Sequence, residues 1–119
     1  VQLAAREFLM VCLCAEWCGV CNAYTQTFEA LKARFPGVRF VWIDVEDEED
    51  LIHPLEVENF PTLLIALGHQ ARFFGPLRPQ IETVERLIRA HLDDPDAPAL
   101  AHPDVAALAA RLSANARSA

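Results

Sequence analysis

Long hydrophobic runs and basic residues are both scarce in this sequence. The longest apolar run, FLMVCLCA from Phe8 to Ala15, falls far short of the roughly 18 residues that a membrane-spanning helix needs. Lys and Arg number 10 against 17 Asp and Glu, for a formal net charge of -7, and no polybasic segment occurs. We therefore expect no membrane span within this chain and no nucleic-acid partner.

Cysteine is absent outside one stretch, CLCAEWCGVC, which runs from Cys12 to Cys21. Cysteines packed so closely cannot staple the loops of a secreted disulfide scaffold. A chain of 119 residues with 53% hydrophobic residues can instead bury a core of its own as one globular domain. Extra thiols are a liability under oxidising conditions, so this composition favours the cytoplasm. An export signal or anchor removed from ahead of Val1 would make the periplasm the alternative.

Apolar periodicity predicts alternating strands and helices. The run Phe8–Ala15 is typical of a strand buried on both faces. From Gly19 to Phe35 the apolar residues recur at intervals of four, three and four, which indicates one face of a helix made of Tyr24, Phe28, Leu31 and Phe35. A second helix should open with the acidic run Glu46–Asp50, and a third, after Pro79, should carry an apolar stripe. That stripe comprises Ile81, Val84, Leu87, Ile88 and Leu92, and further strands are expected at Val38–Asp44, Asn59–Leu67 and Ala71–Phe74.

This order of elements, β-α-β-α-β-β-α, predicts an α/β fold with a mixed four-stranded sheet covered by helices on both faces. We expect the domain to occupy residues 1–92, and a linker rich in Pro and Asp to follow at 93–103. Residues 104–119 should form an Ala-rich helical extension with Val105, Leu108 and Leu112 along one side. Such a narrow stripe suits docking on the domain or on a partner.

The segment Cys18-Gly19-Val20-Cys21 lies where the first predicted strand gives way to the first predicted helix. Unpaired N–H groups and the dipole at a helix N-terminus stabilise a thiolate. A spacing of three places both sulfurs on one turn, and at about 100° per residue Cys21 falls at the edge of the buried stripe. Cys18 is then the accessible nucleophile and Cys21 the shielded resolving thiol, a division that thiol–disulfide exchange requires.

The motif AEWCGVC, followed at Phe60 by FPT, resembles the thioredoxin family, and the resemblance extends from Phe8 to Leu92. It implies a thioredoxin-like fold and a thiol–disulfide oxidoreductase that acts on protein disulfides. A reductase or another dithiol would supply the electrons, and no bound cofactor is needed beyond the redox-active disulfide Cys18–Cys21.

The same resemblance implies a cis peptide bond between Phe60 and Pro61, facing that disulfide. An extended substrate segment would pair with the backbone at Phe60. The substrate groove would be lined by Trp17, Gly19, Val20, Phe60, Pro61 and the loop near Gly75.

Several positions depart from the family pattern. Gly-Val separates the cysteines where thioredoxins usually have Gly-Pro. Cys12 matches the position of the family's buried Asp, and Phe40 matches that of the Lys that often partners it. Without this charged pair, proton transfer at Cys21 must use water, Glu16 or another route. The opening strand and helix of full-length thioredoxins are also largely missing.

Two rival functions remain open. As alternatives to the oxidoreductase, the chain could be a redox-silent binding module with this fold, or a protein in which the cysteines ligate zinc or an iron–sulfur cluster. Against a metal, Cys12 and Cys14 lie at a spacing of two on a strand rather than in a turn. These two cysteines either pack as small hydrophobes or trap Cys21 in a disulfide under oxidation.

The remaining polar features are expected to be solvated surface. The acidic run EDEED indicates an exposed helix start rather than a cation site. The histidines lie on different elements, and their spacing is not that of metal ligands, so each is expected at the surface. They are His53, His69, His91 and His102.

Overall fold

The computed structural model describes residues 8–15, 19–57, 59–68, 70–77, 80–94 and 96–118, without the side chains of Val20 and of residues 113–118. Within these ranges the predicted α/β architecture is confirmed, including its order of strands and helices. The elements are β1 (Phe8–Cys14), α2 (Gly19–Arg34), β2 (Val38–Asp44), α3 (Glu49–Ile52), β3 (Thr62–Leu67), β4 (Gln70–Pro76), α4 (Ile81–Asp93) and α5 (Pro103–Ser118).

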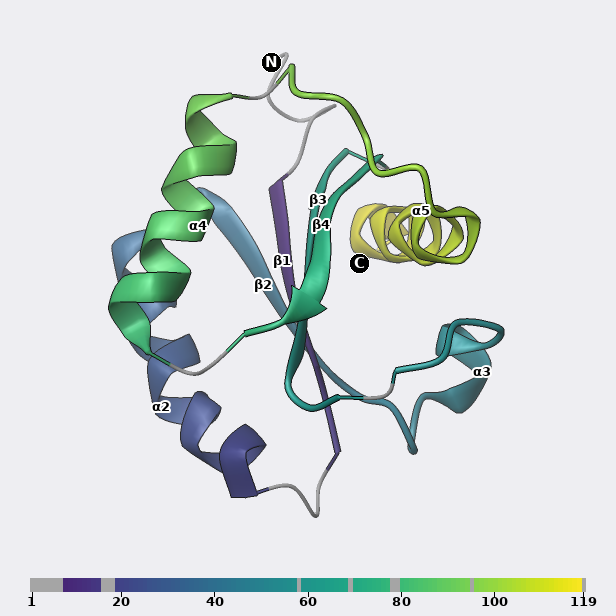
Figure 1. Cartoon of the computed structure of the whole chain (residues 1–119), viewed down its shortest axis with the longest axis horizontal. Helices are drawn as coiled ribbons and strands as arrows, with labels where there is room; N and C mark the ends of the chain where they lie inside the picture. The colour runs from purple at the N-terminus through teal and green to yellow at the C-terminus, as the bar shows by residue number, and fades with distance from the viewer. Residues whose placement is uncertain are drawn as a thin grey trace.

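The strands form one mixed sheet in the order β2-β1-β3-β4. β1 runs parallel to β2 and antiparallel to β3, and β3 pairs antiparallel with β4. Figure 1 shows α2 and α4 on one face of this sheet and α3 and α5 on the other. The central strand β1 is therefore covered on both faces, and all of its residues are buried, as the continuous apolar run predicted.

α2 and α4 present apolar side chains to the same face of the sheet. Tyr24, Phe28, Leu31 and Phe35, the stripe predicted for the first helix, are all buried. On α4 the stripe is confirmed at Val84 and Ile88, which are fully buried, but it is wrong at Leu92, which is 41% exposed. Leu92 lies in the last turn of α4, where the neighbouring His91, and not Leu92, has its ring near Phe73 of β4.

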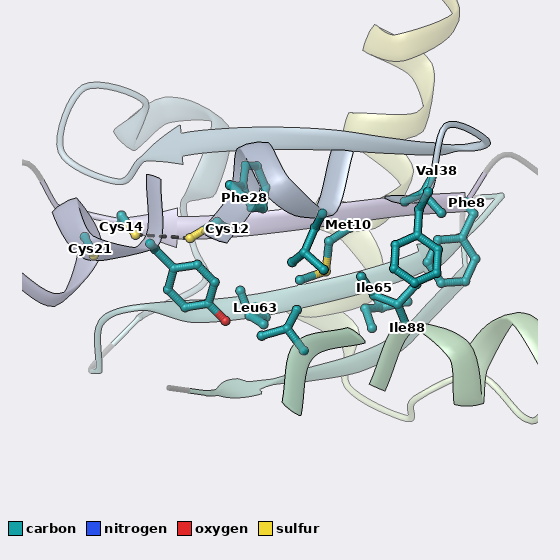
Figure 2. Packing of buried hydrophobic residues seen from close by; sticks show 14 residues of the cluster. Phe8, Met10, Cys12, Cys14, Cys21, Phe28, Val38, Leu63, Ile65 and Ile88 are labelled. Atoms are coloured by element: carbon teal, nitrogen blue, oxygen red, sulfur yellow. Dashed lines mark hydrogen bonds between the residues drawn. The ribbon is translucent and has the colours of Figure 1, made fainter. Parts of the chain in front are cut away.

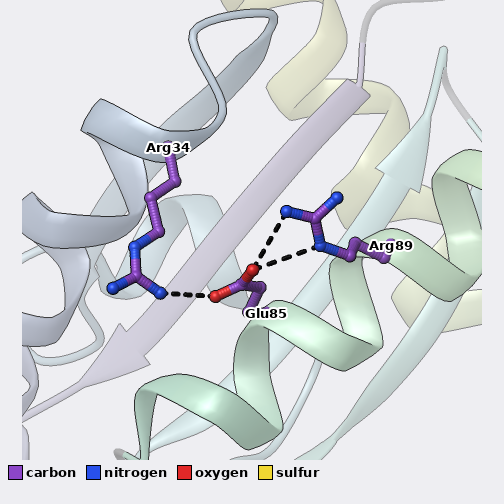
Figure 3. A network of polar contacts seen from close by, with 3 residues as sticks. All are labelled: Arg34, Glu85 and Arg89. Carbon is purple, nitrogen blue, oxygen red and sulfur yellow. Dashed lines mark hydrogen bonds and ion pairs between the residues drawn. The ribbon is translucent and has the colours of Figure 1, made fainter.

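A surface ion-pair network also joins α2 to α4. Glu85 on α4 accepts hydrogen bonds from Arg34 on α2 and from Arg89, one turn along α4 (Figure 3). The two guanidinium groups, Arg89 first, hold the pKa of the Glu85 carboxyl below its usual range.

The helix predicted to open at the acidic run is shorter than expected. Residues 45–48 form a turn, and α3 begins only at Glu49. The Asp44 carboxylate accepts the backbone N–H groups of Glu46 at 2.9 Å and Asp47 at 3.2 Å, so a side-chain turn competes with the helix here. α3 ends at Ile52, ahead of a cis peptide bond between His53 and Pro54.

β4 extends further than its sequence predicted. Gly75 and Pro76 were expected to end the strand, yet Gly75 pairs with Leu63 and Pro76 with Thr62. β4 is an edge strand, so the missing N–H of a proline need not interrupt the hydrogen bonds to β3. This extension brings Gly75 beside the start of β3.

The C-terminal helix α5 docks on the sheet of its own chain. Val105, Leu108 and Leu112, the predicted stripe, are buried together with Ala109 in the cluster between the sheet and α3. Two hydrogen bonds secure this face: Leu100 N–H to Ala71 O at 2.8 Å, and Arg111 Nε to Leu51 O at 3.0 Å. None of the described helices is long and apolar enough to cross a membrane.

Candidate active site

The predicted site residues divide into two groups. Gly19, Cys21, Phe60, Pro61 and Gly75 belong to the described part of the chain. Glu16, Trp17 and Cys18 lie outside the described residues, as does the side chain of Val20, so their predicted roles stay predictions.

Strand register brings the described members of the site to one end of the sheet. Leu13 pairs with Thr62 across β1 and β3, and Thr62 pairs with Pro76 across β3 and β4. The end of β1, the start of β3 and the end of β4 therefore lie side by side. α2 begins at the same end, a few residues after β1 finishes.

The loop that leads into β3 has the geometry that the resemblance implied. The peptide bond between Phe60 and Pro61 is cis. Pro61 is buried, whereas Phe60 is half-buried and packs against the core between the sheet and α2. The Thr62 hydroxyl donates to the backbone carbonyl of Asn59, which holds this loop against the first residue of the strand.

Cys21 is shielded from solvent, as its place on the helical stripe predicted. Its side chain is 1% exposed in the first turn of α2, while Gly19, two residues earlier, is exposed. A Cβ at Gly19 would meet no atom within 4 Å. The entry to α2 thus places an accessible surface directly beside a buried thiol.

Cys12 and Cys14 lie in the same buried cluster as Cys21. Their Sγ atoms are 3.2 Å apart, and Figure 2 shows all three cysteines at one end of the cluster, with Cys14 between the other two in that view. Tyr24 belongs to this group as well. Burial, and then the nearby Cys12 and Cys14, raise the pKa of its hydroxyl well above the ordinary value, so Tyr24 stays protonated.

Sequence reasoning identified Tyr24 only as a stripe residue. Two sequence spacings indicate that Tyr24 could face the thiols. Tyr24 follows Cys21 by three residues, which puts both on one side of the helix. Cys12 and Cys14 are two residues apart, which puts both on one face of the strand. Choosing the face that β1 turns toward α2 required the tertiary packing.

The position matched to the family's buried Lys is occupied by an aromatic contact. Phe40 packs edge-on against Phe28, with ring centroids 5.2 Å apart. Beside it, a hollow of about 360 Å³ lies between α2 and β2, with Trp42 40% exposed at its wall. The hollow is lined by Ala15, Asn22, Thr25, Phe28, Glu29, Lys32, Trp42 and Asp44.

In the described part of the chain, no group of three or more His, Cys, Asp or Glu side chains could hold a metal ion. His53 and His102 are exposed, and residues 46–50 of the acidic run are exposed as expected. His91, predicted at the surface, is half-buried, and burial, followed by the charge of Arg72, lowers its pKa. His69 lies outside the described residues.

The shielded Cys21 in the first turn of α2 and the cis-proline loop at Phe60–Pro61 lie at the same end of the sheet. Comparison with known families decides the assignment, because the family model for thioredoxin matches residues 1–85. This chain belongs to the thioredoxin family. The match ends within α4, so α5 lies beyond it.

Individual thioredoxins support the assignment. The thioredoxin of Oryctolagus cuniculus is 36% identical over 88 residues, which cover 71% of this chain and 84% of that protein. Thioredoxin H2-1 of Oryza sativa subsp. japonica is 26% identical over 86 residues, which cover 71% of this chain but only 62% of that protein. The structure of Fasciola hepatica thioredoxin matches with a TM-score of 0.66 and 22% identity over 76% of this chain and 86% of that one, which shows the shared fold.

Proposed function

We propose that this protein is a thiol–disulfide oxidoreductase in which Cys18 is the nucleophile and Cys21 the resolving thiol. The observation that carries the proposal is the burial of Cys21 in the first turn of α2, at the sheet end that also holds the Phe60–Pro61 loop. Membership of the thioredoxin family supports the same reaction class.

The reaction proceeds by two exchanges. The Cys18 thiolate attacks one sulfur of a protein disulfide, a mixed disulfide forms, and the other substrate sulfur leaves as a thiolate and takes up a proton. Cys21, after losing its proton, then attacks Cys18 Sγ and releases the second substrate thiol. Two electrons pass to the substrate, and a reductase or dithiol partner reduces the resulting Cys18–Cys21 disulfide.

The substrate would bind over the loops at this end of the sheet. Trp17, Gly19 and Val20 form the proposed platform on the α2 side. Phe60, Pro61 and Gly75 form the opposite wall, and the Phe60 backbone pairs with an extended substrate segment. Gly75 suits this place, because it pairs with Leu63 near the start of β3.

Proton transfer at Cys21 has to proceed without a buried acid. Among the described residues, the buried polar or charged side chains are Thr62 and Arg72, and no Asp or Glu is buried. Cys12 occupies the acid's position and Phe40 that of the Lys. We infer that water or Glu16 accepts the Cys21 proton. The clustered thiols favour a reducing compartment, the cytoplasm, for this chemistry.

A Cys18→Ser variant tests the proposal, with a disulfide-bonded reporter peptide as substrate and dithiothreitol as electron donor. Because an alcohol cannot replace the thiolate, turnover should fall by about a hundredfold or more. Cys21→Ser is the matched variant: reduced first and then mixed with the peptide in the absence of dithiothreitol, it should stall after the first exchange and accumulate a mixed disulfide on Cys18, measurable by intact mass.

Three results would contradict this function. The first is full turnover by Cys18→Ser. The second is a wild type without turnover whose Cys18 is alkylated at the rate of an ordinary thiol with a pKa of about 8.5, as in a redox-silent binding module. The third is stoichiometric zinc or iron in the purified protein, as in a cysteine-ligated metal protein.

A further inference from the structure

Cys12 and Cys14 are two nucleophilic groups that the proposed reaction leaves unused. They are 0% and 1% exposed, and their Sγ atoms lie 3.2 Å apart. Both lie on the face of β1 that packs against α2, in one cluster with Cys21. A pair of thiols in contact, next to a resolving cysteine, has the composition of a second redox couple.

We propose that Cys12 and Cys14 form a buried dithiol–disulfide couple that exchanges electrons with the active site through Cys21. The inference rests on the proposed function, because the Cys18–Cys21 disulfide is the oxidant. It assigns a redox site to the part of the chain where the sequence suggested either packing or a trap for Cys21.

The exchange needs two steps and no further reagent. The Cys14 thiolate attacks Cys21 Sγ, a Cys14–Cys21 bond forms, and Cys18 leaves as a thiolate. The Cys12 thiolate then attacks Cys14 Sγ, a Cys12–Cys14 bond forms, and Cys21 leaves as a thiolate. The two protons lost by Cys12 and Cys14 balance those gained by Cys18 and Cys21, and two electrons move from the buried pair to the active site.

Strand geometry sets the order in which the two couples are oxidised. Residues two apart on a strand have Cα atoms about 6.6 Å apart, near the upper limit of about 6.8 Å for a disulfide. A Cys12–Cys14 bond therefore strains β1, and strained disulfides are the more easily reduced. The buried couple should stay reduced until the active site is oxidised, and then accept a second oxidising equivalent.

Burial makes the active site the route to this couple. External oxidants cannot contact side chains that are 0% and 1% exposed while β1 is covered by α2. Cys21 is the cysteine of the CGVC motif that the structure places in the same cluster, and Figure 2 draws Cys14 between Cys21 and Cys12.

Cleavage after glutamate places the two pairs of cysteines on different peptides, which mass spectrometry can measure separately. Cleavage after Glu7, Glu16 and Glu29 gives fragment 8–16, with Cys12 and Cys14, and fragment 17–29, with Cys18 and Cys21. The full chain is incubated with increasing oxidised glutathione, alkylated in denaturant and digested. Fragment 17–29 should lose its two thiols first, and fragment 8–16 should then lose two hydrogens without becoming linked to the other fragment.

Two variants test the route. In Cys21→Ala, and separately in Cys18→Ala, fragment 8–16 should keep both thiols at every oxidant concentration, because the relay is broken and the pair is shielded. The same variants oxidised in denaturant should form the Cys12–Cys14 disulfide, which shows that burial is what protects the pair.

The outcomes separate the two proposals. If the wild type turns over substrate while fragment 8–16 keeps both thiols, the buried couple is wrong and the proposed function stands. A final product in which the fragments are linked by a disulfide also overturns the couple, in favour of a trapped Cys21. If no Cys18–Cys21 disulfide forms and there is no turnover, both proposals fail.

Discussion

The two faces of the sheet share their strands but bury different chemistry. On β1, Cys12 and Cys14 belong to the cluster under α2 and α4, whereas Val11 and Leu13 belong to the cluster under α3 and α5. Among the described residues, Cys21 and Tyr24 also lie on the first face. The second face is aliphatic in this region and closed by α5.

This division places the thiols of β1 and its large aliphatic side chains in different clusters. Successive residues of a strand point to opposite faces, so β1 can offer thiols to the active-site helix and large aliphatic side chains to the opposite core. The aliphatic face depends on a helix that lies beyond the region matched to the thioredoxin family. Substitutions on the two faces should therefore have different consequences.

Removing α5 should have the largest effect of all the changes that test the difference between the two faces. A chain stopped after Asp94 loses Val105, Leu108, Ala109 and Leu112 from the core. The loss should cost roughly 5 kcal/mol or more from apolar burial, as much as the whole net stability of many domains. Urea unfolding followed by circular dichroism should show a weak or absent cooperative transition.

A chain stopped after Leu112 is the matched control, since it retains all the α5 residues that are buried in the described structure. It should unfold cooperatively with a midpoint near that of the full chain. An unchanged midpoint for the shorter chain, stopped after Asp94, would mean that α5 does not complete the core.

Leu108→Ala on α5 tests the same face with a single change. Leu108 is 0% exposed, so the cavity should lower the free energy of unfolding by about 2–5 kcal/mol. The Cys18 alkylation rate of the folded protein should stay as in the wild type, because the change lies across the sheet from Cys21. Ala107→Ser, at an exposed position on α5, should cost only about 0.5 kcal/mol. A slower Cys18 reaction in Leu108→Ala would show that the two faces are coupled.

The smallest expected effect lies on the outer surface of the cysteine face, at Glu85. Arg89 and Arg34 lower the pKa of the Glu85 carboxyl. The contribution of this carboxylate to the stability of the fold is therefore fully present above the ordinary carboxyl pKa of about 4.3. It is lost as the pH falls through the lowered pKa of the folded protein. Glu85→Gln should therefore flatten the stability profile in that acidic range, measured by thermal unfolding at a series of pH values.

Glu82→Gln, at an exposed position on the same helix, is the control. In the acidic range its dependence of stability on pH should resemble that of the wild type more than Glu85→Gln does. Identical profiles for Glu85→Gln and the wild type would show that the link between α2 and α4 adds nothing to the fold.

Local patterns determined much of this protein in advance. Apolar runs placed β1 and β2, and the period of about 3.6 placed α2, within a residue of their observed bounds, because side-chain direction on a helix repeats with backbone geometry. The same periodicity placed Cys21 on the buried edge of α2. The paired motifs around Cys18 and Pro61 carried the family assignment.

Other features depend on what each segment packs against, and only the tertiary structure decided them. β4 continues through Pro76 because it is an edge strand. In the last turn of α4, His91 has its ring near Phe73 of β4, while Leu92 is exposed. The stripe on α5 is equally suited to a partner, and its docking on this sheet follows from the open aliphatic face. The sequence placed Cys12 and Cys14 on one face of a strand. Their contact with each other, and their place beside Cys21 and Tyr24, arose when that face was packed against α2.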